Sequence, residues 1–160
     1  MKRQKLCTSN FTFLILGQLS SLIGNYTLKF ALSMYVLEQT GSASIFAALL
    51  TAAMLPTILL SPLGGILADR ANRRSIMVGL DTLSGFTVLV AGLVLPFGHD
   101  IWVIGALLVI LSVLAAFESP TVQACIPQML SEDNLMKGNA AVNQVQAIAG
   151  LITPFLGSLV

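Results

Sequence analysis

The sequence is organised around one charged stretch, Gly64-Gly65-Ile66-Leu67-Ala68-Asp69-Arg70-Ala71-Asn72-Arg73-Arg74, which separates two long apolar runs. It gathers an aspartate and three arginines in a chain of which 56% is hydrophobic and only 9% is charged. Anchoring at one membrane surface would explain the arginines, but not the paired glycines, the aspartate or their spacing. The stretch is therefore either a simple topological anchor or a turn with a function of its own.

The composition indicates a membrane protein. A mean hydropathy of +0.88 over 160 residues means more apolar surface than a core of this size can bury, so lipid is the natural solvent. The net charge is only +1, and the basic residues form no patch of the kind that binds nucleic acid. No metal-ligand spacing, histidine pair or catalytic triad is present, which argues against an enzyme and against a metal or another cofactor.

Five apolar runs predict an all-α membrane fold. After a cytoplasmic segment at residues 1–10, transmembrane helices are expected at residues 11–36, 43–67, 76–95, 101–124 and 139–160. The basic residues flanking these spans all fall on one side of the membrane; they are Lys2, Arg3, Lys5, Arg70, Arg73, Arg74 and Lys137. By the positive-inside rule this side is the cytoplasm, which also places the N-terminus and the charged stretch there.

The first predicted span carries a polar face. Its polar residues recur at spacings of three or four, as one face of a helix requires; they are Gln18, Ser21, Asn25, Lys29 and Ser33. A lysine at this depth must snorkel, pair or line a watery cavity, because a charge in lipid costs about 3 kcal/mol. Two alternatives remain open for Lys29: snorkelling or pairing with Glu38, and lining a cavity. The whole face favours the cavity, and Gln18, Ser21, Asn25 and Lys29 are the candidates for lining it.

The connections between spans carry local signals. Gly64 and Gly65 predict a close approach of two helices, and Asn72 is expected to take the left-handed conformation of a tight reversal. A local break of the fourth helix is expected at Ser119-Pro120. The polar segment 127–138 predicts a long connection in which Ser131 caps a short amphipathic helix.

The charged stretch resembles a known signature. Gly65-x-x-x-Asp69-Arg70-x-Asn72-Arg73-Arg74 is similar to the loop between helices two and three of the major facilitator superfamily, whose usual form is G-x-x-x-D-R-x-G-R-R/K. Asn72 in place of glycine is the one departure. The resemblance implies an incomplete N-terminal six-helix half of a major facilitator fold, present as an N-terminal fragment that lacks the C-terminal half of the transporter.

Other segments resemble one branch of that superfamily. Residues 17–25 are similar to the first helix of the branch containing macrolide efflux proteins and the enterobactin exporter, where an aspartate often replaces Asn25. The connection of residues 120–140 is similar to that of the same branch. Residues 149–158 are similar to a degraded form of the fifth-helix motif of antiporters, represented here by Pro154 and Gly157.

The resemblance also implies a gate. In the superfamily the loop aspartate, a loop arginine and an acidic residue of the fourth helix form a charge relay, which corresponds here to Asp69, Arg73 and Glu118. The expected gating group, with residues near this loop, is Gly65, Asp69, Arg70, Arg73, Arg74, Asp81 and Glu118. Glu118 either binds a proton, because a low dielectric favours the neutral carboxyl group, or forms a permanent structural ion pair.

The expected function is secondary active transport in the plasma membrane, the inner membrane of a bacterium. The resemblance implies proton-coupled efflux of a drug-like or siderophore-like small molecule by alternating access, with the lipid bilayer, the substrate and protons as partners. The competing expectation is a truncated membrane remnant that does not transport, or a membrane interaction protein.

Overall fold

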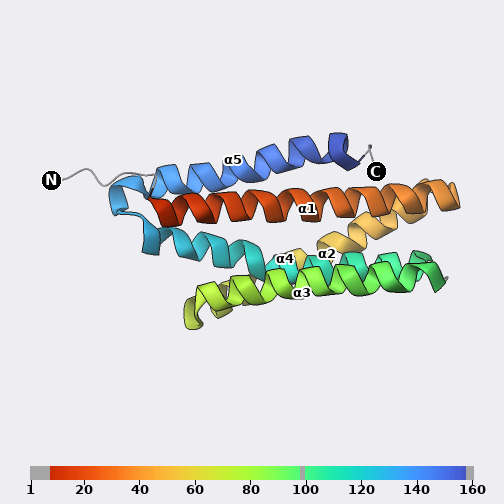
Figure 1. The fold of residues 1–160 in the computed structure, drawn as a ribbon, viewed down its shortest axis with the longest axis horizontal. Helices are drawn as coiled ribbons and strands as arrows, with labels where there is room; N and C mark the ends of the chain where they lie inside the picture. The colour runs from red at the N-terminus through yellow and green to blue at the C-terminus, as the bar shows by residue number, and fades with distance from the viewer. Residues whose placement is uncertain (1–7, 98–99, 158–160) are drawn as a thin grey trace.

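Five long helices form nearly all of the described chain (Figure 1). The computed structural model describes residues 8–97 and 100–157. The elements are α1 (Ser9–Thr40), α2 (Ala43–Arg70), α3 (Arg73–Val94), the 3-10 turn η1 (Leu95–Phe97), α4 (Asp100–Met129) and α5 (Glu132–Gly157). The predicted all-α fold is confirmed for this part of the chain. Most of the predicted cytoplasmic segment and the end of the fifth predicted span lie outside the described residues.

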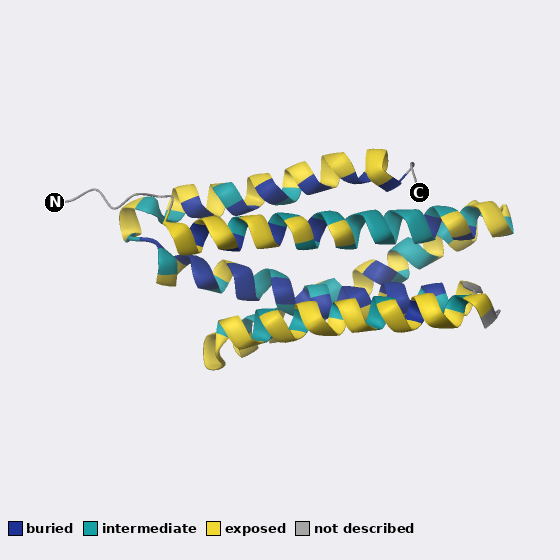
Figure 2. Ribbon diagram, in the orientation of Figure 1, coloured by how far each residue is buried: buried dark blue, intermediate teal, exposed yellow. Residues whose placement is uncertain are grey.

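The helices pack around α4. Figure 1 shows α5 running beside α1 and α3 running beside α4, while α2 lies behind and has its most extensive interface with α4. Figure 2 shows dark blue residues along much of α4 and mostly exposed residues along α3. Small and apolar residues of α4 such as Ile104, Leu108 and Ala116 are almost fully buried. The core of the described bundle therefore lies along α4.

The outward faces of α2 and α3 are apolar. Exposed large side chains on them include Leu59, Phe86, Leu89 and Leu93. In water such a surface would drive association, whereas in a bilayer it faces hydrocarbon at no cost. Among the described residues, three helices are long and apolar enough to cross a membrane: α2, α3 and Ile101–Met129 of α4. The helices α1 and α5 are also long, but their polar residues lower their hydropathy, and their crossing stays a prediction.

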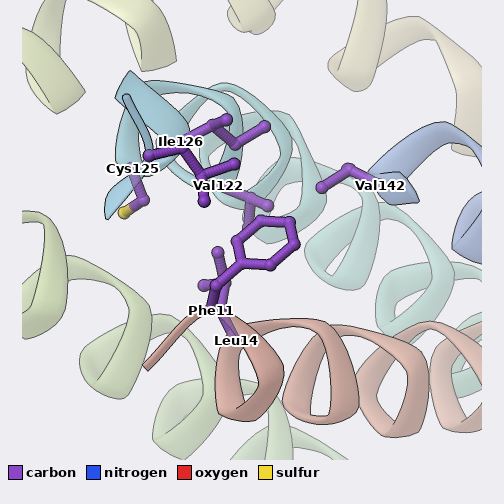
Figure 3. Packing of buried hydrophobic residues seen from close by; sticks show 7 residues of the cluster. Phe11, Leu14, Val122, Cys125, Ile126 and Val142 are labelled. Carbon is purple, nitrogen blue, oxygen red and sulfur yellow. The ribbon is translucent and has the colours of Figure 1, made fainter. Parts of the chain in front are cut away.

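Apolar packing joins the start of α1 to the end of α4 and to α5. Figure 3 shows Phe11 and Leu14 of α1 facing Val122 and Ile126 of α4, with Val142 of α5 at the side. All of these side chains are less than a tenth exposed. Burying one such side chain stabilises a fold by about 1.5–3 kcal/mol in water. In lipid, close packing rather than water exclusion supplies most of the attraction, so this cluster fixes how the three helices fit.

The turn between α1 and α2 consists of two residues with separate tasks. Gly41 has a φ of 61°, the left-handed conformation that glycine adopts without strain, and its N–H donates to the carbonyl oxygen of Leu37. The Oγ of Ser42 accepts a hydrogen bond from the N–H of Ile45 and caps α2. The helices can therefore reverse direction almost at once.

Asn72 does not take the predicted left-handed conformation. Its φ and ψ are −70° and 108°, and its Oδ1 accepts a hydrogen bond of 3.1 Å from the N–H of Arg74. Asparagine favours both the left-handed region and the N-cap position, and here the start of α3 requires the second. The prediction for Asn72 was wrong because the reversal is made by an extended residue that caps the next helix.

Removing this cap has a defined expected effect. Asn72→Ala should lower the free energy of unfolding by about 1 kcal/mol, because the first turn of α3 loses a side-chain acceptor. Asn139→Ala is the matched control, since Asn139 is exposed inside α5 and alanine is the better helix former there. Thermal unfolding in detergent compares the two variants. Equal stability of Asn72→Ala and the wild type would contradict the capping role.

The fourth helix is not broken at Ser119-Pro120, contrary to prediction. It continues through Pro120 and Pro127 to Met129. Pro120 has no N–H, so the carbonyl oxygen of Ala116 has no helical partner from that residue. This oxygen faces Gly64 of α2, where an added Cβ would lie only 2.6 Å away. The missing hydrogen bond is thus tolerated at the point where another helix packs on α4.

The close approach predicted for the glycine pair is confirmed for Gly64. A Cβ at Gly64 would also lie 2.8 Å from Cγ of Pro120, closer than real Cβ atoms come, and 3.1 Å from Cα of Phe117, which is tighter than most real contacts. A Cβ at Gly65 would meet no atom within 4 Å. The two neighbouring glycines therefore have different structural roles, and only Gly64 is needed for the fit of α2 against α4.

The long connection predicted for residues 127–138 is also wrong. Only Leu130 and Ser131 separate α4 from α5, and the predicted amphipathic segment is the first part of α5 itself. The N–H of Asn134 donates to the carbonyl oxygen of Ser131 at 2.8 Å, and Glu132 and Asp133 lie in the first turn. Acidic residues at this position favour the start of a helix, so the polar residues extend α5 instead of forming a loop.

Candidate functional site

A group of polar side chains lies between the helices of this apolar bundle. We call it the polar seam; its members are Gln18, Ser21, Asn25, Lys29, Asp81, Ser112 and Glu118. The α1 members lie on one helical face, as their spacing predicts. Contacts from this face reach α3 and α4, so the structure brings the candidate cavity residues together with two of the candidate gating residues.

Ser21 is the centre of one end of the polar seam. Its Oγ lies 3.2 Å from Oε1 of Glu118 and 3.4 Å from Oδ1 of Asp81, and it accepts a hydrogen bond of 3.4 Å from Nδ2 of Asn25. A hydroxyl group has one hydrogen, so it can donate to only one of the two carboxylates at a time. Two carboxylates that compete for one donor repel each other when both are ionised. The Ser21 hydroxyl group therefore links α1 to either carboxylate, one at a time.

Glu118 and Asp81 differ in their surroundings. Glu118 is 8% exposed on α4, whereas Asp81 is exposed on α3. Glu118 interacts with more neighbours, which include Ser21, Lys29 and Gln18. A buried carboxylate needs such partners because leaving it unpaired in low dielectric is costly. Glu118 is thus the carboxyl group that the surrounding helices hold most firmly.

Gln18 contributes a buried amide beside Glu118. The side chain is 3% exposed, and its Oε1 has no hydrogen-bond partner among the described residues. Its other end interacts with Glu118. An unpaired buried acceptor costs about 1–3 kcal/mol and is relieved when a donor arrives. The O–H of a protonated carboxyl group is a donor of this kind.

Lys29 forms the other end of the polar seam. Its Nζ donates a hydrogen bond of 3.1 Å to Oγ of Ser112, which itself donates to the carbonyl oxygen of Leu108 at 2.7 Å. Thr57 of α2 donates to the carbonyl oxygen of Ser112 at 3.1 Å. The structure therefore turns Lys29 inward to Ser112 on α4. Of the two alternatives for Lys29, it favours the cavity over a pair with Glu38.

Sequence reasoning missed Ser112, Thr57 and Tyr26. Ser112 is fully buried and receives Lys29, and Tyr26 lines the same cavity as Lys29 and Thr57. A signal did exist for Ser112 and Thr57, because a hydroxyl group within an apolar span often bonds to a neighbouring helix. The signal could not say which helix, since that depends on how each helix is rotated.

The charged stretch forms a compact turn at the end of α2. Nη2 of Arg73 lies 3.7 Å from Oδ1 of Asp69, and its Nε donates 2.9 Å to the carbonyl oxygen of Ala68. Arg73 thereby satisfies one of the last carbonyl groups of α2 and opposes the helix dipole. Arg70 and Arg74 are exposed beside it. Because Asp69 is 74% exposed, the ion pair itself contributes less than about 1 kcal/mol.

The three residues of the predicted relay do not lie together. Arg73 pairs with Asp69 and lies near Cys125, whereas Glu118 is held by Ser21 about two helical turns away along α4. Within the described chain, the salt bridge of this turn joins Arg73 to Asp69 and does not include Glu118. The gating roles of these residues and of Gly65 stay predictions, and the conformation seen here keeps the two groups apart.

The fifth-helix motif residues differ in exposure, although they lie only three positions apart on α5. Gly157 is buried and packs against Phe30 of α1, and Thr153 one turn earlier is buried as well. Pro154 is exposed inside the helix. Gly157 therefore allows α1 and α5 to approach, and any role of Pro154 lies on the outward face. Among the described residues, no group of three histidine, cysteine or acidic side chains has the arrangement of a metal site.

Comparison with known protein families shows which family the chain belongs to. A sequence profile described as Major Facilitator Superfamily matches residues 14–160. The chain belongs to the major facilitator superfamily. Because this family consists of membrane transporters for small molecules, a membrane location and contact with lipid follow for the chain. No solved structure matches it.

Two relatives within the superfamily are efflux proteins by name. The chain is 30% identical over 148 residues to Macrolide efflux protein A of Streptococcus pyogenes, which covers 89% of this chain and 36% of the relative. It is 29% identical over 124 residues to Macrolide efflux protein A of Enterococcus faecalis, which covers 74% of this chain and 37% of the relative. The chain thus spans little more than a third of the length of these relatives. The match to the predicted branch of the superfamily is confirmed.

Proposed function

We propose that this chain supplies the first helices of a proton-coupled exporter for a drug-like or siderophore-like small molecule. The polar seam is the observation that carries the proposal. Placing ionisable groups inside a membrane bundle costs free energy, and such groups are typical of ion pathways and substrate sites. Here they join α1, α3 and α4, so a change of charge at Glu118 acts on three helices together.

Glu118 is the proposed proton carrier. Ser21 holds its carboxylate by a hydrogen bond, and Oε1 of Gln18 has no partner among the described residues. Rotation of the Gln18 amide would turn this oxygen toward Glu118, where it can accept the O–H once the proton has bound. Protonation removes the repulsion from Asp81 and frees Ser21 to donate to that aspartate. The contacts between α1, α3 and α4 are therefore redistributed, which is the kind of local change that biases a rocking transition.

The turn with Asp69 and Arg73 is the proposed latch at the cytoplasmic surface. Arg70 and Arg74 are exposed in this turn, and each can bind a carboxylate of the longer transporter to which we propose this chain contributes. We place the N-terminus in the cytoplasm, because the basic residues gather on one side of the predicted spans. Alternating access would then proceed by motion of this half against a second half, with Glu118 meeting the latch in another conformation.

Transport by everted membrane vesicles tests the proposal. The full gene product that carries this chain is expressed, and uptake of a labelled macrolide and of a catecholate siderophore is followed after a proton gradient is imposed. Uptake of at least one probe, abolished by an uncoupler and absent from vesicles without the protein, is expected. Uptake no higher than in empty vesicles for either probe would overturn the proposal and favour a non-transporting membrane protein.

A further inference from the structure

A half-enclosed cavity of about 420 Å³ lies between α1, α2 and α4. Its walls are mostly apolar, and they include Leu50, Ala53, Met54 and Leu108. The volume falls in the range of about 300–1,000 Å³ that is usual for sites of small molecules. A site of this kind binds the apolar body of a ligand by burial and selects it by a few polar groups.

Three polar side chains line the cavity. Lys29 and Tyr26 come from successive positions of one face of α1, and Thr57 comes from α2. The Lys29 ammonium group has three N–H donors, and Ser112 accepts from it at 3.1 Å. Ser112 holds the ammonium group in position and leaves two donors for a ligand. The cavity therefore combines apolar walls with a fixed positive charge.

The charge of Lys29 is not neutralised by a salt bridge. Within the described chain, the ion pair recorded is that of Arg73 and Asp69, and Glu118 interacts with Lys29 only over a longer distance. Glu118 accepts a hydrogen bond from Ser21, which also lies within reach of Asp81, whereas Lys29 donates to Ser112. Lys29 is half-buried. An ammonium group in such a position without a close carboxylate gains from an anionic ligand, because partly desolvated opposite charges attract more strongly than they do in water.

We propose that this cavity binds an anionic amphiphile, with its acidic group on Lys29 and its apolar body against the α2 wall. The inference rests on the proposed export function, for which it names the substrate class. Both a water-soluble organic acid and an anionic lipid have the required chemistry. A cationic amphiphile would bring a like charge beside Lys29 and is disfavoured.

Binding measurements with three naphthalene probes test this inference. Protein in nanodiscs of phosphatidylcholine is titrated with 2-naphthoate, neutral 2-naphthol and cationic 2-naphthylmethylamine, which share an apolar ring system and differ in charge. Naphthoate should bind at least about tenfold more tightly than either of the others, because a charge-assisted hydrogen bond contributes that much. Tighter binding of the cation, or equal binding of all three, would overturn the inference.

Two variants show whether Lys29 is responsible. Lys29→Met should weaken naphthoate binding about tenfold while leaving naphthol binding unchanged, and the latter shows that the cavity is still folded. Lys137→Met is the matched control, because Lys137 is exposed on α5 and should not affect binding. Unchanged naphthoate affinity in Lys29→Met would overturn the inference.

The source of the ligand is read from the lipid of the nanodisc. If naphthoate no longer binds in discs of phosphatidylglycerol, an anionic lipid occupies the cavity. If naphthoate binds equally well in these discs, the occupant is a water-soluble organic acid. Either result supports the inference. All of these readouts are binding constants. Failure of the export function would appear in the vesicle assay alone, so the two failures are distinguishable.

Discussion

Gly64→Val should prevent α2 from docking on α4 and leave little folded protein. The added side chain would enter the space occupied by the Ala116 carbonyl oxygen, Cγ of Pro120 and Cα of Phe117, two of which are backbone atoms. Overpacking a helix interface usually costs about 1–3 kcal/mol, and backbone cannot move aside as a flexible side chain does. Because α2 and α4 share the largest interface of the bundle, a wider separation also loosens the contacts around it.

The neighbouring glycine provides a close control. Gly64→Ala should lower the midpoint of thermal unfolding in detergent, whereas Gly65→Ala should keep or raise it, because no atom lies within 4 Å and alanine favours a helix by about 0.5–1 kcal/mol. Folding is the readout here, since the predicted gating role of Gly65 concerns transport. Equal unfolding midpoints for the two alanine variants would contradict the packing that we describe.

Glu118→Gln should abolish uptake driven by a pH gradient. Glutamine preserves the size of the side chain and can still accept a hydrogen bond from Ser21, but it cannot bind or release a proton near neutral pH. If Glu118 carries the proton, gradient-driven uptake falls to the level of empty vesicles, while passive exchange of substrate continues. Exchange under equal pH on both sides is measured in the same vesicles to separate coupling from folding.

The matched control is Glu132→Gln. Glu132 is exposed in the first turn of α5, so this variant makes the same chemical change outside the polar seam. It should retain gradient-driven uptake. Normal gradient dependence in Glu118→Gln would instead remove Glu118 as the coupling residue and leave it a structural role, such as holding Ser21 of α1 on α4.

The order and type of the helices could be predicted because they depend on local properties. Hydropathy located the helices, and the spacing of Gln18, Ser21 and Lys29 defined a face that the structure turns toward other helices. Asn72 was assigned wrongly because one residue type serves two kinds of turn. The connection before α5 was predicted too long because the helix that follows Ser131 was expected to be short and separate, whereas it continues without a break into the fifth predicted span.

The contacts between helices could not be predicted in the same way. Sequence gives the depth of Glu118 along α4, but the rotation of α4 decides whether it faces Ser21 or Arg73, and neighbouring helices set that rotation. The cavity beside Lys29 requires three helices to be placed at once. The polar partners Ser112 and Thr57 were missed for this reason, although their residue types were visible.

Substrate-induced proton movement is the most direct test of the role of the polar seam. Everted vesicles that hold the gene product are acidified inside, an acridine dye reports the gradient, and the probe that the protein transports is added. We predict that substrate partly dissipates the gradient in the wild type and in Glu132→Gln, and that it has no effect in Glu118→Gln. The same dissipation in Glu118→Gln as in the wild type would contradict the account.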